Sequence, residues 1–431
     1  MFFEREEGGN AAVLVHIDFS DESKREDSDE FLELTRSAGA EPLAVIRGSR
    51  NAPSPRLFVG EGKLEEIRTA VEENHADLVL FNHSLKPSQE RNLEKELQCR
   101  VLDRTGLILD IFAQRARTYE GKLQVELAQL EFLTTRLIRG WTHLERQKGG
   151  IGLRGPGETQ LETDRRLIRV RINSIRRRLK KVRVQRETSR RARVQAEIPA
   201  VSLVGYTNAG KSTLFNRITD ADVYTANQLF ATLDPTLRRI ELGDVGTLVL
   251  ADTVGFIRHL PHKLVEAFQA TLQEAAEATL LLHLVDAASC ERDDNVAQVE
   301  NVLAEIGAAD VPTLMVFNKI DLLEQTARID RNAEGIPERV WLSAATGEGC
   351  DLLLQAINER LATKIVKGTL KLEPEQTRLR AGLFNLNAVL DEHYNDEGQC
   401  QLKLRLAQKD FRQLLSQLNI AEESLVWVTK P

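Results

Sequence analysis

Short apolar runs alternate with amphipathic stretches over the first part of the chain. Apolar runs bounded by polar or turn-forming residues predict strands at 13–19, 43–46, 78–81 and 100–102. Apolar residues three or four positions apart predict helices at 27–37, 63–74 and 88–97. Because strands that alternate with helices are typical of layered α/β folds, we expect a small α/β domain over residues 1–115.

The spacing of apolar residues then changes to steps of three, four and seven. Over residues 116–195 this spacing predicts two long helices packed as a hairpin with a coiled-coil seam. At roughly 1.5 Å per residue, helices of about 24 residues would form an arm on the order of 35 Å long, with the glycine-rich loop 146–157 at its tip. The predicted seam consists of Leu123, Leu127, Leu130, Leu133 and Leu137, facing Leu161, Ile168, Ile172, Ile175, Leu179 and Val182.

Three aromatic residues, Tyr119, Phe132 and Trp141, lie in or near this predicted arm. They could stack on exposed nucleic-acid bases. Aromatic side chains mostly fill cores, however, so we favour packing at the base of the hairpin.

A second α/β pattern follows the arm. Apolar runs predict strands at 200–204, 313–317 and 340–342, and the turn at 243–246 predicts a β-hairpin. We expect a doubly wound sheet over residues 196–365.

The last segment, residues 366–431, has strand-like runs at 402–406 and 425–428 around a helical pattern at 409–417. This pattern predicts a small α/β C-terminal domain. Its sequence does not indicate a function.

Composition narrows the class of protein. The chain has 431 residues, of which 42% are hydrophobic and 29% charged, as in soluble multi-domain proteins. No apolar run approaches the roughly 18 residues that span a bilayer, and the N-terminus lacks the apolar core of a secretion signal. We therefore expect a cytoplasmic protein without stable membrane insertion, and nothing demands more than a monomer. Cys99, Cys290, Cys350 and Cys400 lack zinc-type spacing, so we interpret them as reduced, buried thiols.

Positive charge is concentrated in the predicted arm. The formal net charge of the chain is -7, yet residues 136–193 contain about nineteen Lys or Arg against about five Asp or Glu. Phosphate backbones respond to such local concentration, which favours an arm that binds RNA. The alternative is a flexible connector with a solvated basic face, because charge runs are usually solvated. The predicted RNA contacts are Lys148, Arg154, Arg165, Arg166, Arg176, Arg177 and Arg178.

A phosphate-binding motif follows the strand at 200–204 and opens a helical pattern, which is the context that such a loop requires. Its glycines let backbone N–H groups converge on phosphates, while Lys211 neutralises charge and Ser212 can bind Mg²⁺. The pattern alone also occurs by chance, so the later motifs decide. The predicted residues are Gly205, Tyr206, Thr207, Asn208, Ala209, Gly210, Lys211, Ser212 and Thr213.

A second motif, Asn318-Lys319-Ile320-Asp321, follows the predicted strand 313–317 and selects guanine. The Asp321 carboxylate can accept hydrogens from guanine N1 and N2, which adenine cannot supply, so ATP would leave it unpaired. Asn318 would hold the phosphate loop, and the Lys319 stem would lie over the base. After the strand at 340–342, Ser343, Ala344 and Ala345 would offer backbone N–H groups to the guanine oxygen.

Two further segments complete the predicted nucleotide site. Thr232 would add a hydroxyl to Mg²⁺ when the γ-phosphate is present, Asp252 would hold the metal through water, and the Gly255 N–H would meet the γ-phosphate. Each segment alone could be an ordinary turn, but their order along the chain favours a GTP site. The segments are Phe230, Ala231, Thr232, Leu233 and Asp234, then Asp252, Thr253, Val254 and Gly255.

These ordered motifs resemble those of translation-factor-related GTPases. The glycine-rich segment 149–166 (GGIGLRGPGETQLETDRR) is similar to the signature of the HflX family, and the resemblance covers most of residues 11–364. It implies a P-loop GTPase that binds GTP and GDP, docks on the large ribosomal subunit and can separate ribosomal subunits during stress. The resemblance is weakest over the final segment.

The residue that orients the hydrolytic water is unknown from sequence. Many GTPases place Gln after the Asp-x-x-Gly turn, but Phe256 stands here, which predicts slow intrinsic hydrolysis supported by Lys211, Thr232 and Gly255. Asn208 resembles a loop asparagine that holds K⁺ in some relatives, although it could merely stabilise its own loop. His259 and His262 lie nearby, but such histidines are more often structural.

Three functions remain open at this point. The first is a GTP-controlled factor that inserts a basic arm into the ribosome and splits subunits. The second is a checkpoint GTPase of ribosome assembly or RNA modification. The third is an RNA-binding scaffold that senses nucleotide with little turnover.

Overall fold

The structure is a computed structural model. It describes residues 11–19, 27–136, 160–195, 198–219, 229–230, 232–243, 245–257, 269–362, 365–373, 376–386, 388–394, 399–418 and 420–429.

The first domain is a four-stranded parallel sheet between two pairs of helices. The sheet has the order β2-β1-β3-β4. Helices α1 and α4 cover one face, and α2 and α3 cover the other. The elements are β1 (Ala11–Phe19), α1 (Ser28–Ser37), β2 (Glu41–Arg50), α2 (Glu61–Glu73), β3 (Leu78–Phe81), α3 (Pro87–Leu97), β4 (Arg100–Asp103) and α4 (Arg104–Arg115).

The predicted strands and helices of this domain are confirmed, but sequence periodicity missed α4. Eight of its twelve residues are buried, from Arg104 to Phe112. A helix that is buried nearly all round shows no alternation of polar and apolar faces, and periodicity therefore cannot identify it.

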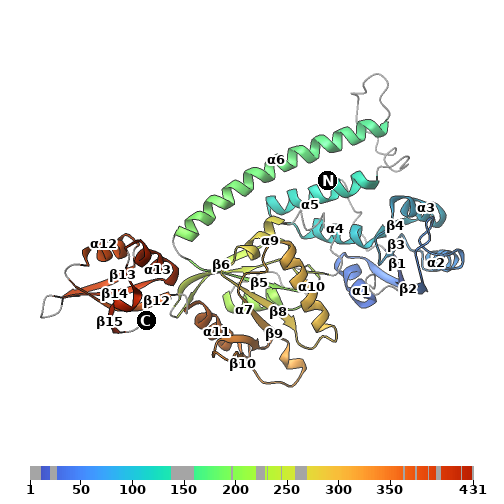
Figure 1. Cartoon of the computed structure of the whole chain (residues 1–431). Coiled ribbons are helices and arrows are strands. Elements are labelled where there is room, and N and C mark those ends of the chain that lie inside the picture. The colour runs from blue at the N-terminus through green and yellow to red at the C-terminus, as the bar shows by residue number, and fades with distance from the viewer. Residues whose placement is uncertain are drawn as a thin grey trace.

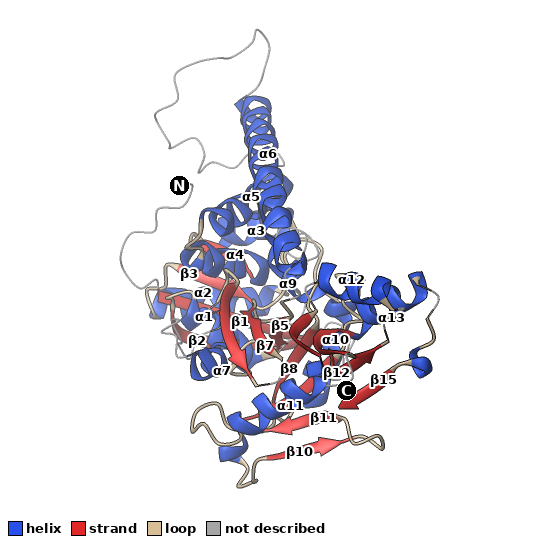
Figure 2. Cartoon of the chain, turned by 90° about the vertical axis from the view of Figure 1, so that its left-hand side faces the viewer, coloured by secondary structure: helices blue, strands red, loops and turns tan. Residues whose placement is uncertain are grey.

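The predicted hairpin is confirmed as helices α5 (Tyr119–Arg136) and α6 (Gln160–Gln195), here called the arm, but the two helices have 18 and 36 residues rather than about 24 each. Leu123, Leu127, Leu130 and Leu133 of α5 pack on Ile168, Ile172, Ile175 and Leu179 of α6. Ion pairs flank this seam, with Glu126 to Arg171 at 2.7 Å and Glu131 to Arg176 at 2.8 Å. In Figure 2 α6 stands out from the body of the molecule. Leu137, Trp141 and the predicted tip loop lie outside the described residues.

The central domain contains a seven-stranded sheet in the order β10-β11-β9-β8-β5-β7-β6. The inner strands run parallel, while β6 and β10 run antiparallel at the two edges. Helices α7 and α11 cover one face, and α9 and α10 the other, as in a doubly wound fold. The elements are β5 (Ala200–Gly205), α7 (Lys211–Thr219), β6 (Thr236–Leu242), β7 (Gly246–Asp252), α9 (Gln269–Ala276), β8 (Leu280–Asp286), α10 (Arg292–Glu305), β9 (Thr313–Asn318), η3 (Ile320–Leu322), β10 (Arg328–Arg331), β11 (Pro337–Trp341) and α11 (Cys350–Ala362).

The C-terminal domain is an antiparallel sheet, β13-β14-β12-β15, with α12 and α13 packed on one face. It lies on the opposite side of the central domain from the first domain (Figure 1). The Arg405 guanidinium donates to the Val245 carbonyl of the central domain. The elements are β12 (Ile365–Leu372), α12 (Thr377–Asn385), β13 (Val389–Tyr394), β14 (Cys400–Ala407), α13 (Gln408–Gln417), η4 (Glu422–Ser424) and β15 (Val426–Thr429).

Two sequence expectations can be compared at this level. None of the four cysteines forms a disulfide, but the expectation that all are buried is wrong, because Cys290 is exposed just before α10. Within the part of the chain that the structure describes, no helix is both long and apolar enough to cross a bilayer.

Candidate nucleotide-binding site

The phosphate loop connects β5 to α7 at the centre of the sheet. Gly205 and Gly210 have φ angles of 149° and 93°, which side-chain-bearing residues rarely adopt. Lys211 is buried, and its Nζ donates to the carbonyl oxygens of Gly205 at 3.0 Å and Tyr206 at 2.7 Å. Burial lowers the pKa of Lys211 to about 8, and the Asp252 carboxylate opposes this shift. The loop thus surrounds a buried cation, as phosphate binding requires.

Asn318 connects the phosphate loop to the loop expected to bind the base. Its Nδ2 donates to the Ala209 carbonyl at 2.8 Å, and its Oδ1 accepts from the Ala344 N–H at 2.9 Å. A Cβ at Gly210 would overlap the Asn318 amide. The side chain is buried, so these bonds hold the two loops together away from water.

The other residues predicted to contact the base lie at the carboxyl ends of β9 and β11. Asp321 is exposed in η3, and Lys319 adopts a left-handed backbone with φ of 68°. The Lys319 Nζ pairs with Asp286 Oδ2 at 2.7 Å. Sequence reasoning missed Asp286, although its position at the end of an apolar strand run was a usable signal. Ser343 is buried and accepts from the Thr346 N–H.

The three predicted metal ligands converge beside the phosphate loop. The Ser212 hydroxyl lies 2.7 Å from the Thr232 hydroxyl and donates to Asp252 Oδ2 at 2.7 Å. Thr232 donates to the same oxygen at 2.9 Å. Two hydroxyls and one carboxylate are hard oxygen donors of the kind that Mg²⁺ prefers, so this set fits the metal that P-loop GTPases use.

The second switch segment, residues 252–257, pairs with the phosphate loop through its backbone. The Phe256 N–H donates to the Gly205 carbonyl at 3.1 Å, and the Phe256 carbonyl accepts from the Thr207 N–H at 2.7 Å. A Cβ at Gly255 would lie 3.0 Å from Lys211 Nζ. The Phe256 side chain is buried in a cluster with Leu272 of α9 and is directed into the core rather than the site.

The first switch segment comprises Leu229, Phe230 and residues 232–234; Ala231 lies outside the described residues. Thr232 reaches the predicted metal site, but the neighbouring side chains do not. Phe230 and Leu233 are buried in a core shared with the first domain. The Asp234 carboxylate accepts N–H groups from Arg117 and Thr118, next to α5. Spacing could not show this, because these partners are distant in sequence.

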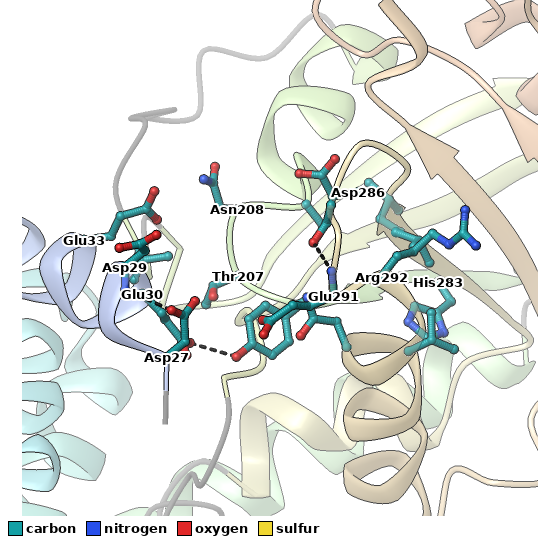
Figure 3. Close-up of a pocket in the computed structure, with 18 residues that line it drawn as sticks. Asp27, Asp29, Glu30, Glu33, Thr207, Asn208, His283, Asp286, Glu291 and Arg292 are labelled. Atoms are coloured by element: carbon teal, nitrogen blue, oxygen red, sulfur yellow. Dashed lines mark hydrogen bonds between the residues drawn. The ribbon is translucent and has the colours of Figure 1, made fainter. Parts of the chain in front are cut away.

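A cavity of about 200 Å³ separates the phosphate loop from α1. In Figure 3 the acidic side chains of α1 and Asp27 lie on one side, Thr207 and Asn208 in the middle, and His283 and Asp286 opposite. The Tyr206 hydroxyl crosses the domain boundary and donates to Glu30 Oε1 at 2.7 Å. Burial, together with the charge of Lys211, lowers the pKa of His283 to about 4. His283 is therefore neutral at physiological pH.

The predicted RNA contacts lie partly on α6. Arg166, Arg177 and Arg178 are exposed, Arg165 is half-buried, and Arg176 is exposed while paired with Glu131. Lys148, Arg154, His259 and His262 lie outside the described residues. Phe132 packs against the core of the first domain under the Arg136 guanidinium, so it fills a core as expected, but near the tip-side end of α5 rather than at the hairpin base. Tyr119 does lie at the base, but it is exposed.

Four family models match the chain in succession. They are the GTP-binding GTPase N-terminal model at residues 25–113, the GTP-binding GTPase Middle Region model at 115–193, the 50S ribosome-binding GTPase model at 200–319 and the HflX C-terminal domain model at 328–424. Together they extend over all three domains and the arm.

Proteins of known family are similar over nearly the whole chain. The GTPase HflX of Escherichia coli (strain K12) is 61% identical over 416 residues, which are 96% of this chain and 98% of that protein. The GTPase HflX of Caldanaerobacter subterraneus is 44% identical over 402 residues, or 92% of each chain. A solved GTP-binding protein from Sulfolobus solfataricus in complex with GDP is 23% identical with a TM-score of 0.45, covering 82% of this chain and 99% of that one.

Proposed function

Because this chain belongs to the HflX family and is a GTPase, we propose that GTP binding controls its docking on the large ribosomal subunit, where it splits stalled ribosomes, especially under stress. The observation that supports this proposal is the core that both switch segments share with the first domain. Leu229, Phe230 and Leu233, together with Val254 and Ile257, pack there against helices next to the arm. A rearrangement at the phosphates would therefore reach the arm.

Nucleotide recognition follows from the loops around the site. The phosphate loop and Lys211 would hold the phosphates, Asp321 would read the guanine edge, and Asn318 keeps the two regions in register. Ser212, Thr232 and Asp252 would hold Mg²⁺, which supplies charge neutralisation for the phosphate oxygens. Thr232 belongs to a switch segment, so its position would report the γ-phosphate.

Hydrolysis by the isolated protein should be slow. The Phe256 side chain is buried in the core and has no polar group that could orient water. We propose that the bound large subunit orders the missing group. A K⁺ ion near Asn208, which is exposed and has φ of 61°, would add positive charge at the transition state. Replacement of potassium by sodium should then slow turnover, and equal rates in the two salts would exclude the ion.

The arm is the proposed RNA-binding limb. Exposed arginines such as Arg177 and Arg178 follow α6 and would contact ribosomal RNA phosphates. Neutralising Arg176, Arg177 and Arg178 together should reduce the salt dependence of ribosome binding without changing nucleotide affinity. An unchanged salt slope would assign binding to another surface. We also propose that the protein acts in the cytoplasm as a monomer.

The decisive experiment mixes intact ribosomes with the protein and GTP and follows light scattering. Dissociation that requires GTP supports the proposal. Binding to subunits without dissociation would favour an assembly or RNA-modification checkpoint. Nucleotide-independent RNA binding would favour a scaffold. Single-turnover GTP hydrolysis should accelerate when large subunits are added, and equal rates would contradict activation by the ribosome.

A further inference from the structure

The first turn of arm helix α5 is completed by a residue of the first switch segment. Asp234 Oδ2 accepts the N–H groups of Arg117 at 2.9 Å and Thr118 at 2.8 Å, and the Thr118 hydroxyl donates to Asp234 Oδ1. The same hydroxyl accepts the Gly121 N–H at 2.9 Å. The Thr118 hydroxyl therefore caps α5 directly, and the Asp234 carboxylate holds Thr118 in place. A carboxylate at a helix N-terminus also interacts favourably with the helix dipole.

The opposite end of this short segment lies in the predicted metal site. Thr232, two residues before Asp234, contacts both Ser212 and Asp252. Two residues of extended chain span at most about 7 Å, so the metal site and the start of α5 lie close together. We therefore expect a displacement of Thr232 by several ångströms to disturb the bonds between Asp234 and α5.

Close packing around Asp234 limits the positions that its side chain and its segment can take. A Cβ on Gly121 would overlap the Asp234 carboxylate, so a larger residue at position 121 would displace that carboxylate from the start of α5. Phe230 packs on Phe112 of α4 with ring centroids 4.6 Å apart. The first turn of α5 is also joined to α6, because Glu120 pairs with Arg186 of α6 at 2.8 Å.

We infer that Asp234 is a positioning residue that couples the placement of Thr232 at the metal site to the capped state of the arm. In this arrangement GTP favours the capped arm, and the capped arm favours GTP, because coupling between two sites is reciprocal. The inference deepens the proposed function and rests on it for the arm's role in RNA binding. The coupling itself needs only nucleotide and is tested without ribosomes.

The first test measures the ratio of affinities for a non-hydrolysable GTP analogue and GDP in the full-length protein with Mg²⁺. Asp234→Ala should lower the preference for the GTP analogue by about fivefold to thirtyfold, the effect expected from losing a helix cap in one state only. Asp234→Asn should largely restore the ratio, because the Asn side-chain oxygen can still accept the N–H groups of Arg117 and Thr118 and its amide can donate to the Thr118 hydroxyl oxygen. If Ala and Asn variants behave alike, charge or direct nucleotide contact explains the effect and the inference fails.

A second variant separates coupling from direct contact with nucleotide. Thr118→Ala removes the hydroxyl on the arm side, outside the phosphate loop and both switch segments. It should lower the same ratio, and hydrogen exchange at the first turn of α5 should lose its dependence on nucleotide. A wild-type ratio in Thr118→Ala would overturn the inference.

The matched control is Glu126→Gln, which removes the ion pair with Arg171 within the arm; among the described residues Glu126 has no hydrogen bond or ion pair with the first switch segment. Its affinity ratio and the nucleotide dependence of exchange at α5 should equal those of wild type. If Glu126→Gln also lowers the preference for the GTP analogue, then any weakening of the arm has this effect, and the inference that Asp234 couples the two sites fails. Ribosome splitting can fail while this coupling holds, so the two proposals are tested separately.

Discussion

At Gly210, one added side-chain atom is expected to weaken nucleotide binding. Its left-handed φ and the nearby Asn318 amide leave no room for a Cβ. Gly210→Ala should displace Asn318, break its bond to Ala209 and weaken GTP and GDP binding by at least about tenfold, the cost of one such buried bond. Titration with fluorescent GDP measures this. Gly62→Ala, in α2 with no neighbour near its Cβ, should bind normally, and equal effects of both substitutions would contradict the explanation.

Glu90 gives the protein a pH-dependent stability. Arg136 pairs with both Glu90 at 2.8 Å and Asp103 at 2.6 Å, and burial raises the pKa of Glu90 to about 8. The folded chain therefore keeps a proton that the unfolded chain releases near the usual pKa of about 4.5. Stability from this group is full below that pH and falls as pH rises toward 8, by at most about 1.4 kcal/mol per unit.

Urea denaturation at pH 5.5, 7 and 8.5 tests the role of Glu90. Glu90→Gln should remove the pH-dependent contribution of Glu90 to the free energy of unfolding, so that the variant gains stability relative to wild type as pH rises. Parallel pH profiles for the two proteins would show that Glu90 does not titrate in this range.

Among the helices, the arm depends on its apolar seam. Ile175 is 1% exposed in that seam, so Ile175→Ala should destabilise the packing of α5 on α6 by about 2–4 kcal/mol. Hydrogen exchange along α6 should rise accordingly. Val184→Ala, on an exposed part of the same helix, should change exchange little. Similar exchange in both variants would mean that the seam does not hold the arm.

Helices with one buried and one exposed face were predictable, whereas a helix buried on nearly all sides and contacts between distant parts of the chain were not. The seam from Leu123 to Leu179 followed from steps of three, four and seven, because one face of each helix is buried. Helix α4 is buried on nearly all sides and was missed. The convergence of Ser212, Thr232 and Asp252 followed from motif order, whereas the placement of Asp234 on α5 depends on how distant parts of the chain pack.

At the scale of the whole molecule, the division into separate hydrophobic cores predicts how many unfolding transitions occur. The first and central domains share one hydrophobic core that includes Phe112 and Phe230, while the C-terminal domain has a separate core around Phe411. Calorimetry should therefore show at least two transitions. GDP at 100 times its Kd should stabilise the larger unit by about 2.7 kcal/mol and leave the C-terminal transition unchanged. A single transition that shifts as a whole with GDP would contradict this division.

The burial of Phe256 also constrains how the enzyme's rate can change during evolution. A glutamine at this position would put an amide in an apolar cluster, at a cost of about 1–3 kcal/mol if left unpaired. A mutation at this position that could speed GTP hydrolysis by the protein alone would thus first destabilise the fold. The proposed dependence on an outside activator would in this way be protected by the stability of the domain itself.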